Sequence, residues 1–355
     1  MHIHELDTPA LVVDLDVMER NLIRMAEYTR AHGLRLRPHT KTHKSPLLGA
    51  RQLANGAAGL TVAKVTEAEV MLASGTEDLL IAFPIFGAEK MRRLVEVAKK
   101  TRVTVSVDSV EAARPIAEAA AAAGITIGVL AEVDAGLHRV GVQPELFVSL
   151  LRGLAPLKGI ELRGMAFYPG HIKNQDPGAL AALSTLIQGL VAEAAAAGFA
   201  LPVVSGGTTP TMWHSHEVAG MNEIRPGTYI FNDRNVVLSG ACTLEDCAAT
   251  IIATVVSTSV PGQFVIDGGS KTFSSDRAIV DGFGLFLDAP DALFEKMNEE
   301  HGYVKHAGHQ RKVGERVRVL PNHICVAVNL HERIYGLRGD QVVESWTVDG
   351  RGKLQ

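Results

Sequence analysis

The residues with the clearest capacity for chemistry lie in one basic stretch, residues 37–46, which reads Arg-Pro-His-Thr-Lys-Thr-His-Lys-Ser-Pro. Residues 34–37 alternate apolar and charged side chains, as a strand does, and Ser45-Pro46 is typical of a helix N-cap followed by proline at the first helical position. Lys41 is therefore expected just beyond the C-terminal end of a strand. The two histidines and the second lysine around it crowd it with potential positive charge, which favours the neutral amine that attacks an aldehyde and holds it as an imine. The alternative is a solvated basic turn without chemistry.

Two more segments place polar groups where predicted strands end. Residues 132–141 end a strand in a turn framed by two glycines, and Arg139 lies in that turn. Residues 167–171 supply Tyr168 and His171, of which the histidine titrates near neutral pH and could act as base on a substrate hydroxyl. The alternatives are an arginine solvated beyond a glycine turn and a histidine that caps a turn.

A glycine-rich turn follows the strand predicted at residues 202–205. Its residues Ser205, Gly206, Gly207 and Thr208 suit phosphate, because glycines let backbone N–H groups approach the oxygens and hydroxyls complete the contacts. Glycine-rich turns are common, but phosphate sites in α/β barrels gather after the seventh and eighth strands, and this turn follows the seventh.

A short segment near the C-terminus offers metal ligands, Pro-Asn-His-Ile-Cys at residues 321–325. Residues 325–330 are predicted to be a strand, and residues two apart on a strand face the same side, so His323 and Cys325 could share one ion. Two ligands are too few for a closed structural zinc site. The alternative is a chance spacing of the two residues.

Short apolar strands alternate with amphipathic helices through most of the chain and would position these groups. Strands are predicted at residues 34–37, 59–63, 79–83, 103–107, 125–133, 162–167, 202–205 and 222–229. Such βα units imply parallel strands joined by right-handed crossovers that close a (β/α)8 barrel, whose functional groups collect at the C-terminal ends of the strands. From Cys242 onward strand patterns dominate, with one helix predicted at residues 292–301, so a mainly β domain follows.

Length, composition and charge limit the partners. The 355 residues fit a barrel of about 250 residues plus a smaller domain. The 35 Lys and Arg against 39 Asp and Glu give a net charge of −4 without a long basic run, so we expect a small metabolite as partner, no nucleic acid and no membrane. Three widely spaced cysteines predict a reducing cytoplasm, and neither a signal peptide nor an apolar run long enough to span a membrane is visible.

Residues 38–44 resemble the cofactor-lysine segment of the D-threonine aldolase and D-serine dehydratase family, the metal-dependent relatives of alanine racemase among pyridoxal-phosphate enzymes. The resemblance covers nearly the whole chain and implies that Lys41 binds pyridoxal 5'-phosphate covalently. It also implies an alanine-racemase-like fold. In that fold residues 8–16 add a strand to the β domain, residues 17–240 form the cofactor-binding barrel, and residues 241–355 form the mainly β metal-binding domain.

The resemblance also assigns roles to the polar segments. It implies that Arg139 hydrogen-bonds the phenolic oxygen of the cofactor and that Tyr168 lies near the pyridine ring. His171 lies a few residues before the position of the aldolases' catalytic histidine. The resemblance also implies that a second segment lies beside the cofactor phosphate, where Gly227 and Thr228 offer backbone amides and Tyr229 offers a hydroxyl.

The same resemblance implies that His323 and Cys325 bind one divalent ion. In well-known aldolases the second metal ligand, at the position of Cys325, is an aspartate, whereas cysteine is associated with the dehydratases. A thiolate favours zinc, and a carboxylate favours manganese or magnesium.

The function that the resemblance implies is a lyase acting on a D-β-hydroxy amino acid. We expect retro-aldol cleavage of D-threonine-type substrates to glycine and an aldehyde. The alternative is a D-serine or D-3-hydroxy amino acid dehydratase, which forms a 2-oxo acid and ammonia. More remote alternatives are an amino-acid racemase, which needs no metal, and a non-catalytic pyridoxal-phosphate carrier, which resembles the barrel alone. A homodimer is expected, with Lys271 and Asp276 as candidates to reach the neighbouring subunit's site.

Overall fold

The computed structural model describes residues 1–308 and 310–355, which divide into two compact units. The barrel unit consists of Arg24–Lys41, Pro46–Gly227 and Lys353–Gln355. The β unit consists of Met1–Ile23, Thr42–Ser45 and Thr228–Gly352. The domain boundaries that we predicted from the sequence stay predictions, and each unit is described by itself.

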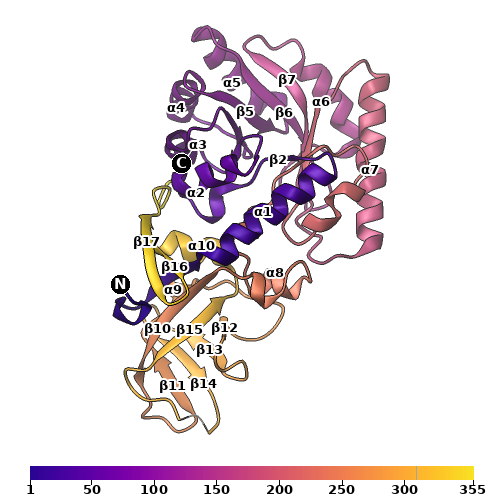
Figure 1. The fold of residues 1–355 in the computed structure, drawn as a ribbon. Helices are drawn as coiled ribbons and strands as arrows, with labels where there is room; N and C mark the ends of the chain where they lie inside the picture. The colour runs from indigo at the N-terminus through magenta and orange to yellow at the C-terminus, as the bar shows by residue number, and fades with distance from the viewer. Residues whose placement is uncertain (309) are drawn as a thin grey trace. The chain divides into compact units, whose positions relative to one another are not determined.

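Among the described residues, the barrel unit holds a sheet of eight strands (Figure 1). They are β2 (Arg35–Leu36), β3 (Leu60–Val62), β4 (Asp78–Ile81), β5 (Arg102–Val107), β6 (Ile127–Val133), β7 (Ile160–Phe167), β8 (Val203–Gly206) and β9 (Glu223–Ile224). All neighbours are parallel, in the order β2-β9-β8-β7-β6-β5-β4-β3. Past the end of β2, His39 bridges to Thr61 in β3, which brings the two ends of this order together. The predicted (β/α)8 architecture is confirmed.

Helices connect the strands, and several begin where the sequence predicts. The α-helices of residues 15–238 are α1 (Leu15–Ala31), α2 (Pro46–Ala54), α3 (Val65–Met71), α4 (Ala88–Ala98), α5 (Val110–Ala122), α6 (Phe147–Leu154), α7 (Pro177–Ala196) and α8 (Arg234–Leu238). Helix α2 starts at Pro46, the predicted first position, because proline's fixed φ suits the first turn and its missing N–H has no helical partner there.

Helix α7 was not recognised in the sequence as an unusually apolar segment. By length and composition alone its 20 residues could cross a membrane. It connects β7 to β8, however, and buries Leu180, Leu183, Ile187 and Leu190 along one side, at the spacing of an amphipathic helix. These observations identify α7 as a helix of the barrel.

The β unit is built on a second sheet. Its strands are β1 (Ala10–Asp14), β10 (Ala249–Ser257), β11 (Gln263–Ile266), β12 (Gly284–Phe286), β13 (Leu293–Met297), β14 (Gly302–Lys305), β15 (Arg316–Pro321), β16 (Arg333–Arg338) and β17 (Gln341–Thr347). Strand β1 is central, antiparallel to β10 and parallel to β16. Its residues Leu11, Val12 and Val13 are fully buried, as expected for a strand covered on both faces.

The helix predicted at residues 292–301 is wrong. This segment forms β13 and the turn that leads into β14, and these two strands pair antiparallel. Phe294 in β13 is fully buried and packs edge-on against Phe273 at 5.2 Å between ring centres. Burial of this aromatic ring and the strand pairing outweigh the helix propensity of the surrounding Glu, Lys and Met residues.

The strand predicted at residues 325–330 is also wrong, because Ile324–Leu330 form helix α10. A β-branched run favours a strand locally. Here the amide N–H of Ile324 donates to the Asp233 carboxylate at 3.0 Å, which satisfies a first-turn group of the helix from a distant part of the chain. Local propensity could not reveal that partner.

Candidate active site

Lys41 lies in a short 3₁₀ turn, η2 (Thr40–Thr42), after β2. The chain around it is buried: Thr40 is 1% exposed, and residues 42–45 are all buried. The Thr40 hydroxyl donates to the carbonyl of Thr61 in β3 at 3.0 Å. The alternative of a solvated basic turn is therefore wrong, and Lys41 is held, half-buried, at the C-terminal end of a barrel strand.

Lys41, Arg139 and Tyr168 come together where β2, β6 and β7 end. The Lys41 Nζ lies 5.9 Å from the centre of the Tyr168 ring, and the guanidinium carbon of Arg139 lies 5.0 Å from the same centre. Both distances are within the range of cation–π attraction. Three predicted site residues from separate strands are thus neighbours around one phenol ring.

The turn that carries Arg139 is held by Asp134, which the sequence analysis did not single out. Its carboxylate accepts the backbone N–H groups of Gly136 at 3.0 Å and His138 at 2.9 Å, and it lies 2.7 Å from the His138 ring Nδ1. Burial alone would raise the pKa of Asp134, but these hydrogen bonds lower it to about 2. The ionised carboxylate therefore organises the turn.

His171 lies in the loop after β7 and is exposed. A Cβ added at Gly136 would lie 3.0 Å from the His171 ring, so the ring covers the glycine turn after β6. Gly136 has a φ of +109°, so glycine is needed both for the backbone conformation and for the close approach of the ring. His171 thereby lies beside the turn of Arg139, where its imidazole is accessible to a proton.

The glycine-rich turn follows β8. Gly207 has a φ of +82°, and a Cβ at Gly206 would overlap the ring of Phe167. The hydroxyls of Thr208 and Thr211 lie 2.9 Å apart. A left-handed residue in such a turn directs successive backbone N–H groups to one side, which is the geometry that holds a phosphate.

Ser205 differs from the rest of this turn. It is fully buried in β8, its hydroxyl donates to Glu223 at 2.8 Å, and it accepts from Arg225 at 2.6 Å. The hydroxyl is therefore engaged inside the barrel. A role for Ser205 at the cofactor phosphate stays a prediction.

In the β unit, His323 and Cys325 flank the start of helix α10 and interact directly. The Cys325 thiolate, and to a lesser degree Asp233, raise the pKa of His323 to about 12, although burial opposes the charge. The Cys325 Sγ also lies 3.2 Å from the Thr42 hydroxyl and 3.8 Å from the Thr228 hydroxyl. Their spacing on a helix start, rather than on a strand, brings the two candidate ligands together.

Asp233 orients His323 and was missed in the sequence. It is fully buried, and its Oδ2 lies 2.9 Å from the His323 Nδ1. A carboxylate at Nδ1 leaves Nε2 for a metal, which is the common arrangement around metal-binding histidines. The separation of 90 positions in the sequence gave no signal for this contact.

The imidazole of His323 and the thiolate of Cys325 suit a divalent ion that keeps some of its coordination positions open. Among residues 1–308 and 310–355, no three His, Cys, Asp or Glu side chains are grouped to hold an ion. An imidazole and a thiolate alone would leave coordination positions for water or substrate, as at catalytic rather than structural sites.

The remaining predicted residues are placed as follows. Gly227 precedes the 3₁₀ turn η6 (Thr228–Ile230), in which Thr228 and Tyr229 are buried. Lys271 is exposed and pairs with Glu300 at 2.7 Å, and Asp276 belongs to the same unit. Their roles toward a cofactor or a neighbouring subunit stay predictions.

Comparison with known families defines the class of protein. Residues 13–235 match the family described as alanine racemase, N-terminal domain, and residues 248–337 match the putative serine dehydratase domain. Alanine racemase of Clostridium difficile, at 16% identity and a TM-score of 0.71, shares the fold. The second match lies outside the barrel and so disfavours a carrier that resembles the barrel alone. The fold and these matches define an alanine-racemase-like pyridoxal-phosphate enzyme.

Individual relatives narrow the class to one family. D-threo-3-hydroxyaspartate dehydratase of Delftia sp. (strain HT23) is 34% identical, over 96% of this chain and 97% of that protein. D-threonine aldolase of Arthrobacter sp. is 30% identical, over 98% and 93%. The crystal structure of D-threonine aldolase from Filomicrobium marinum has a TM-score of 0.93 at 32% identity, over 99% and 98% of the two chains. The chain belongs to the family of D-threonine aldolases, 3-hydroxy-D-aspartate aldolases and D-serine dehydratases, which are pyridoxal-phosphate-dependent lyases.

The cofactor suits the residues of the barrel unit. The left-handed φ of Gly207 gives the turn after β8 the backbone geometry that is typical of phosphate sites. The half-buried amine of Lys41, 5.9 Å from the centre of the Tyr168 ring, is of the type that binds an aldehyde covalently. Solved variants of D-threo-3-hydroxyaspartate dehydratase replace a histidine and a cysteine two positions later, the second in a metal-free form. The same two-residue spacing separates His323 and Cys325.

Proposed function

We propose that this lyase cleaves the Cα–Cβ bond of D-3-hydroxy amino acids and releases glycine and an aldehyde. One observation carries the proposal: the Cys325 Sγ lies 3.2 Å from the hydroxyl of Thr42, and Thr42 is the residue after Lys41 in the chain. The metal-ligand candidate is thereby hydrogen-bonded to the residue that follows the cofactor lysine in the sequence. Relatives named D-threonine aldolase and 3-hydroxy-D-aspartate aldolase support this substrate class.

The residues of the barrel unit would bind and orient the cofactor. When bound to Lys41, pyridoxal phosphate supplies an electron sink for the bond that breaks at Cα. Arg139 would hold the phenolic oxygen ionised through a charged hydrogen bond. The Tyr168 ring, which lies within cation–π distance of both cations, would set the orientation of the pyridine, and Gly206 to Thr208 would hold the phosphate.

The substrate hydroxyl would be handled by two groups. A divalent ion on His323 and Cys325 supplies Lewis acidity to the β-hydroxyl when bound. His171 would take the hydroxyl proton, since its imidazole is exposed and lies beside the turn that carries Arg139. Loss of this proton turns the hydroxyl into the carbonyl of the departing aldehyde and directs cleavage to Cα–Cβ.

We propose zinc as the ion, because an imidazole with a thiolate suits zinc better than manganese or magnesium, which prefer oxygen ligands. The predicted homodimer and the predicted cytoplasmic location are retained as proposals. Light scattering of the purified enzyme would measure the oligomeric state.

A dehydratase is the second candidate, and Cys325 favours it. The relative named D-threo-3-hydroxyaspartate dehydratase has a cysteine two positions after a histidine, as this chain does. In dehydration a base removes the α-proton, hydroxide leaves from Cβ, and the products are a 2-oxo acid and ammonia.

The test separates the two by their products. Enzyme with pyridoxal phosphate and zinc or manganese is incubated with D-threonine, and acetaldehyde is quantified beside 2-oxobutanoate, with L-threonine as the control. We expect acetaldehyde from D-threonine and neither product from L-threonine. Predominant 2-oxobutanoate would establish the dehydratase, and the absence of both products from every D-3-hydroxy amino acid tested would refute the lyase proposal.

Metal variants test the assignment of the ion. Cys325→Ala should abolish turnover while the visible absorbance of the bound cofactor remains, and Asp233→Asn should weaken zinc about 10- to 100-fold through loss of the His323 orientation. Competition with a chromophoric chelator measures the zinc affinity. Cys247→Ala is the matched control, since this thiol should not affect metal binding. Equal zinc affinity in all three variants would contradict the assignment.

A further inference from the structure

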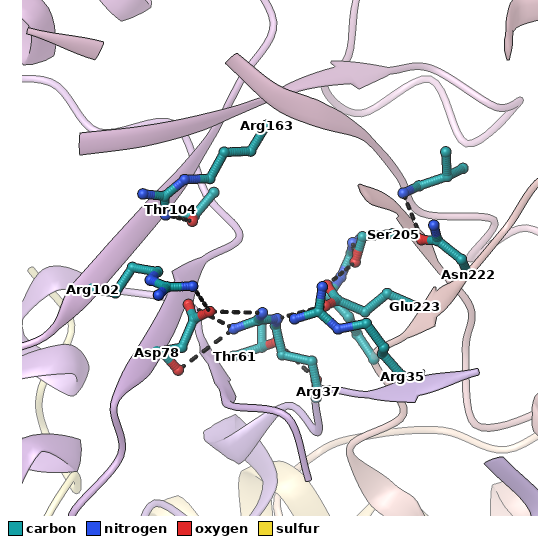
Figure 2. A network of polar contacts seen from close by, with 12 residues as sticks. Arg35, Arg37, Thr61, Asp78, Arg102, Thr104, Arg163, Ser205, Asn222 and Glu223 are labelled. Atoms are coloured by element: carbon teal, nitrogen blue, oxygen red, sulfur yellow. Dashed lines mark hydrogen bonds and ion pairs between the residues drawn. The ribbon is translucent and has the colours of Figure 1, made fainter. Parts of the chain in front are cut away.

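A second polar site lies at the opposite end of the barrel from Lys41. It is a cavity of about 70 Å³ at the N-terminal ends of the strands. Figure 2 shows most of its polar side chains, which reach inward from separate strands. Its lining residues are Arg35, Arg37, Asp78, Leu80, Arg102, Thr104, Leu130, Arg163, Val203 and Glu223.

The charges of this lining do not balance. Four arginines face two carboxylates in the lining, and a third carboxylate, Glu161, pairs with Arg163 from outside it, which gives 4 − 3 = +1 in a protein whose net charge is −4. Arg37 is 5% exposed and pairs with Asp78 at 3.0 Å and Glu223 at 2.9 Å. These two carboxylates are therefore already engaged by the innermost arginine, and the excess positive charge lies with the other three.

The other three arginines, Arg35, Arg102 and Arg163, also line the cavity. Arg35 lies 3.7 Å from Glu223, and Arg102 lies 3.9 Å from Asp78. Both distances exceed that of a hydrogen bond, so these side chains retain N–H groups for another acceptor. Arg163 is held in place by hydrogen bonds of 2.8 Å to Glu161 and 2.8 Å to Thr104.

Glycines make room for this arrangement. A Cβ on Gly128 of β6 would lie 2.5 Å from the guanidinium of Arg163, and a Cβ on Gly59 would lie 2.5 Å from Arg37 Nη1. Glycine inside a strand weakens it and marks a close approach. Because residue 128 is glycine and has no Cβ, the guanidinium of Arg163 lies directly against strand β6.

We propose that this cavity binds a small tetrahedral dianion of the phosphate class. The excess of positive charge attracts an anion, and guanidinium groups bind phosphate oxygens with paired N–H donors. A network that served stability alone would be expected to balance its own charges, because uncompensated like charges repel in a partly buried cavity. The site is distinct from the glycine-rich turn at Gly207, which lies at the other end of the strands.

The test uses enzyme whose cofactor has been reduced onto the protein with borohydride, so that the turn at Gly207 stays filled. Inorganic phosphate is titrated by calorimetry at constant ionic strength, with chloride as the comparison anion. We expect saturable binding of one phosphate per chain that chloride does not reproduce. The variants Arg35→Gln and Arg102→Gln should each weaken phosphate at least about tenfold, since each removes one charged donor.

Arg92→Gln is the matched control, because Arg92 is exposed, pairs with Glu89 on helix α4, and changes the net charge equally. It should bind phosphate as the parent enzyme does. The absence of saturable binding would overturn the proposal, as would equal loss in all three variants. A phosphate monoester titrated in the same way identifies the source: tighter binding than inorganic phosphate indicates the phosphoryl group of a metabolite, and weaker binding indicates the free ion. If the cofactor itself fails to bind, the proposed function fails; the titration is then made on the cofactor-free protein, where weaker phosphate binding by Arg35→Gln and Arg102→Gln but not by Arg92→Gln still decides this proposal.

Discussion

The two ends of the barrel use cationic side chains in opposite ways. After the C-terminal end of β2, Lys41 is half-buried and stands beside the Tyr168 ring. At the N-terminal ends, Arg37 is buried and paired with Asp78 and Glu223. A cation beside an aromatic ring can still react with a ligand, whereas a cation between two carboxylates is committed to the fold. The comparison shows how one scaffold separates chemistry from stability, as barrels of this kind do.

A buried polar chain nevertheless connects the two ends. Glu223 accepts from the Ser205 hydroxyl at 2.8 Å, and this hydroxyl accepts from Arg225 at 2.6 Å. Arg225 also donates to the carbonyl of Phe167 at 2.9 Å, one residue before Tyr168. The interior of the barrel therefore contains a chain of hydrogen bonds that runs from Glu223 through Ser205 and Arg225 to the end of β7.

The largest expected effect is that of Lys41→Ala, which should reduce lyase turnover to background while the unfolding midpoint stays near that of the parent. The amine has no substitute in covalent cofactor binding. Borohydride reduction followed by peptide mapping should recover the cofactor on Lys41 in the parent and on no residue in the variant. Lys99→Ala, a surface lysine paired with Glu96, is the control. Recovery of the label on Lys44 or Lys271 would end the assignment.

His171→Asn should lower kcat by about a hundredfold or more, the usual contribution of a general base, with little change in KM. The substitution keeps a polar side chain near Gly136 but removes the titratable group. Steady-state kinetics against pH measure the effect, and the variant should lose the limb of the kcat profile that the imidazole contributes. A variant with normal kcat would leave His171 as a cap of the turn after β7.

Arg37→Met should act on stability and not on chemistry. Removing the guanidinium leaves Asp78 and Glu223 buried without their partner, which costs about 3–5 kcal/mol of unfolding free energy. Urea unfolding measures that loss, and kcat per folded molecule should stay unchanged below the transition. A lowered kcat with unchanged stability would show that Arg37 acts in turnover, and would contradict its assignment to the stability of the barrel.

The smallest effect is expected in the pH dependence of the stability that the Asp134 carboxylate contributes. Its pKa is about 2 in the folded protein, below the ordinary value of 3.8, so the unfolded chain binds the proton more tightly. The contribution of the carboxylate to stability is therefore fully present above pH 3.8 and is lost as the pH falls toward 2. The difference in urea midpoint between the parent and Asp134→Asn should shrink over this interval. A difference that stays constant would show that the charge does not hold the turn.

Much of the barrel could be predicted from local patterns. Apolar segments bounded by polar turns located its strands, and Ser45-Pro46 marked the start of helix α2. Because the strands are parallel, residues after their C-terminal ends share one edge, which brought Lys41, Arg139 and Tyr168 into one prediction. The physical basis is short-ranged, since side-chain alternation and proline geometry act over a few residues.

The tertiary structure alone decided what depends on distant partners. Helix α10 forms where β-branched residues predicted a strand, because Asp233 binds its first turn from 91 positions away. The arginine cavity assembles side chains from strands that are far apart in the sequence, and each arginine taken singly looks like a surface charge. The hydrogen bonds of the Ser205 hydroxyl to Glu223 and Arg225 likewise join residues 18 and 20 positions apart. Hydrogen bonds and ion pairs such as these depend on separation in space, and residue order does not determine that separation until the sheet has closed.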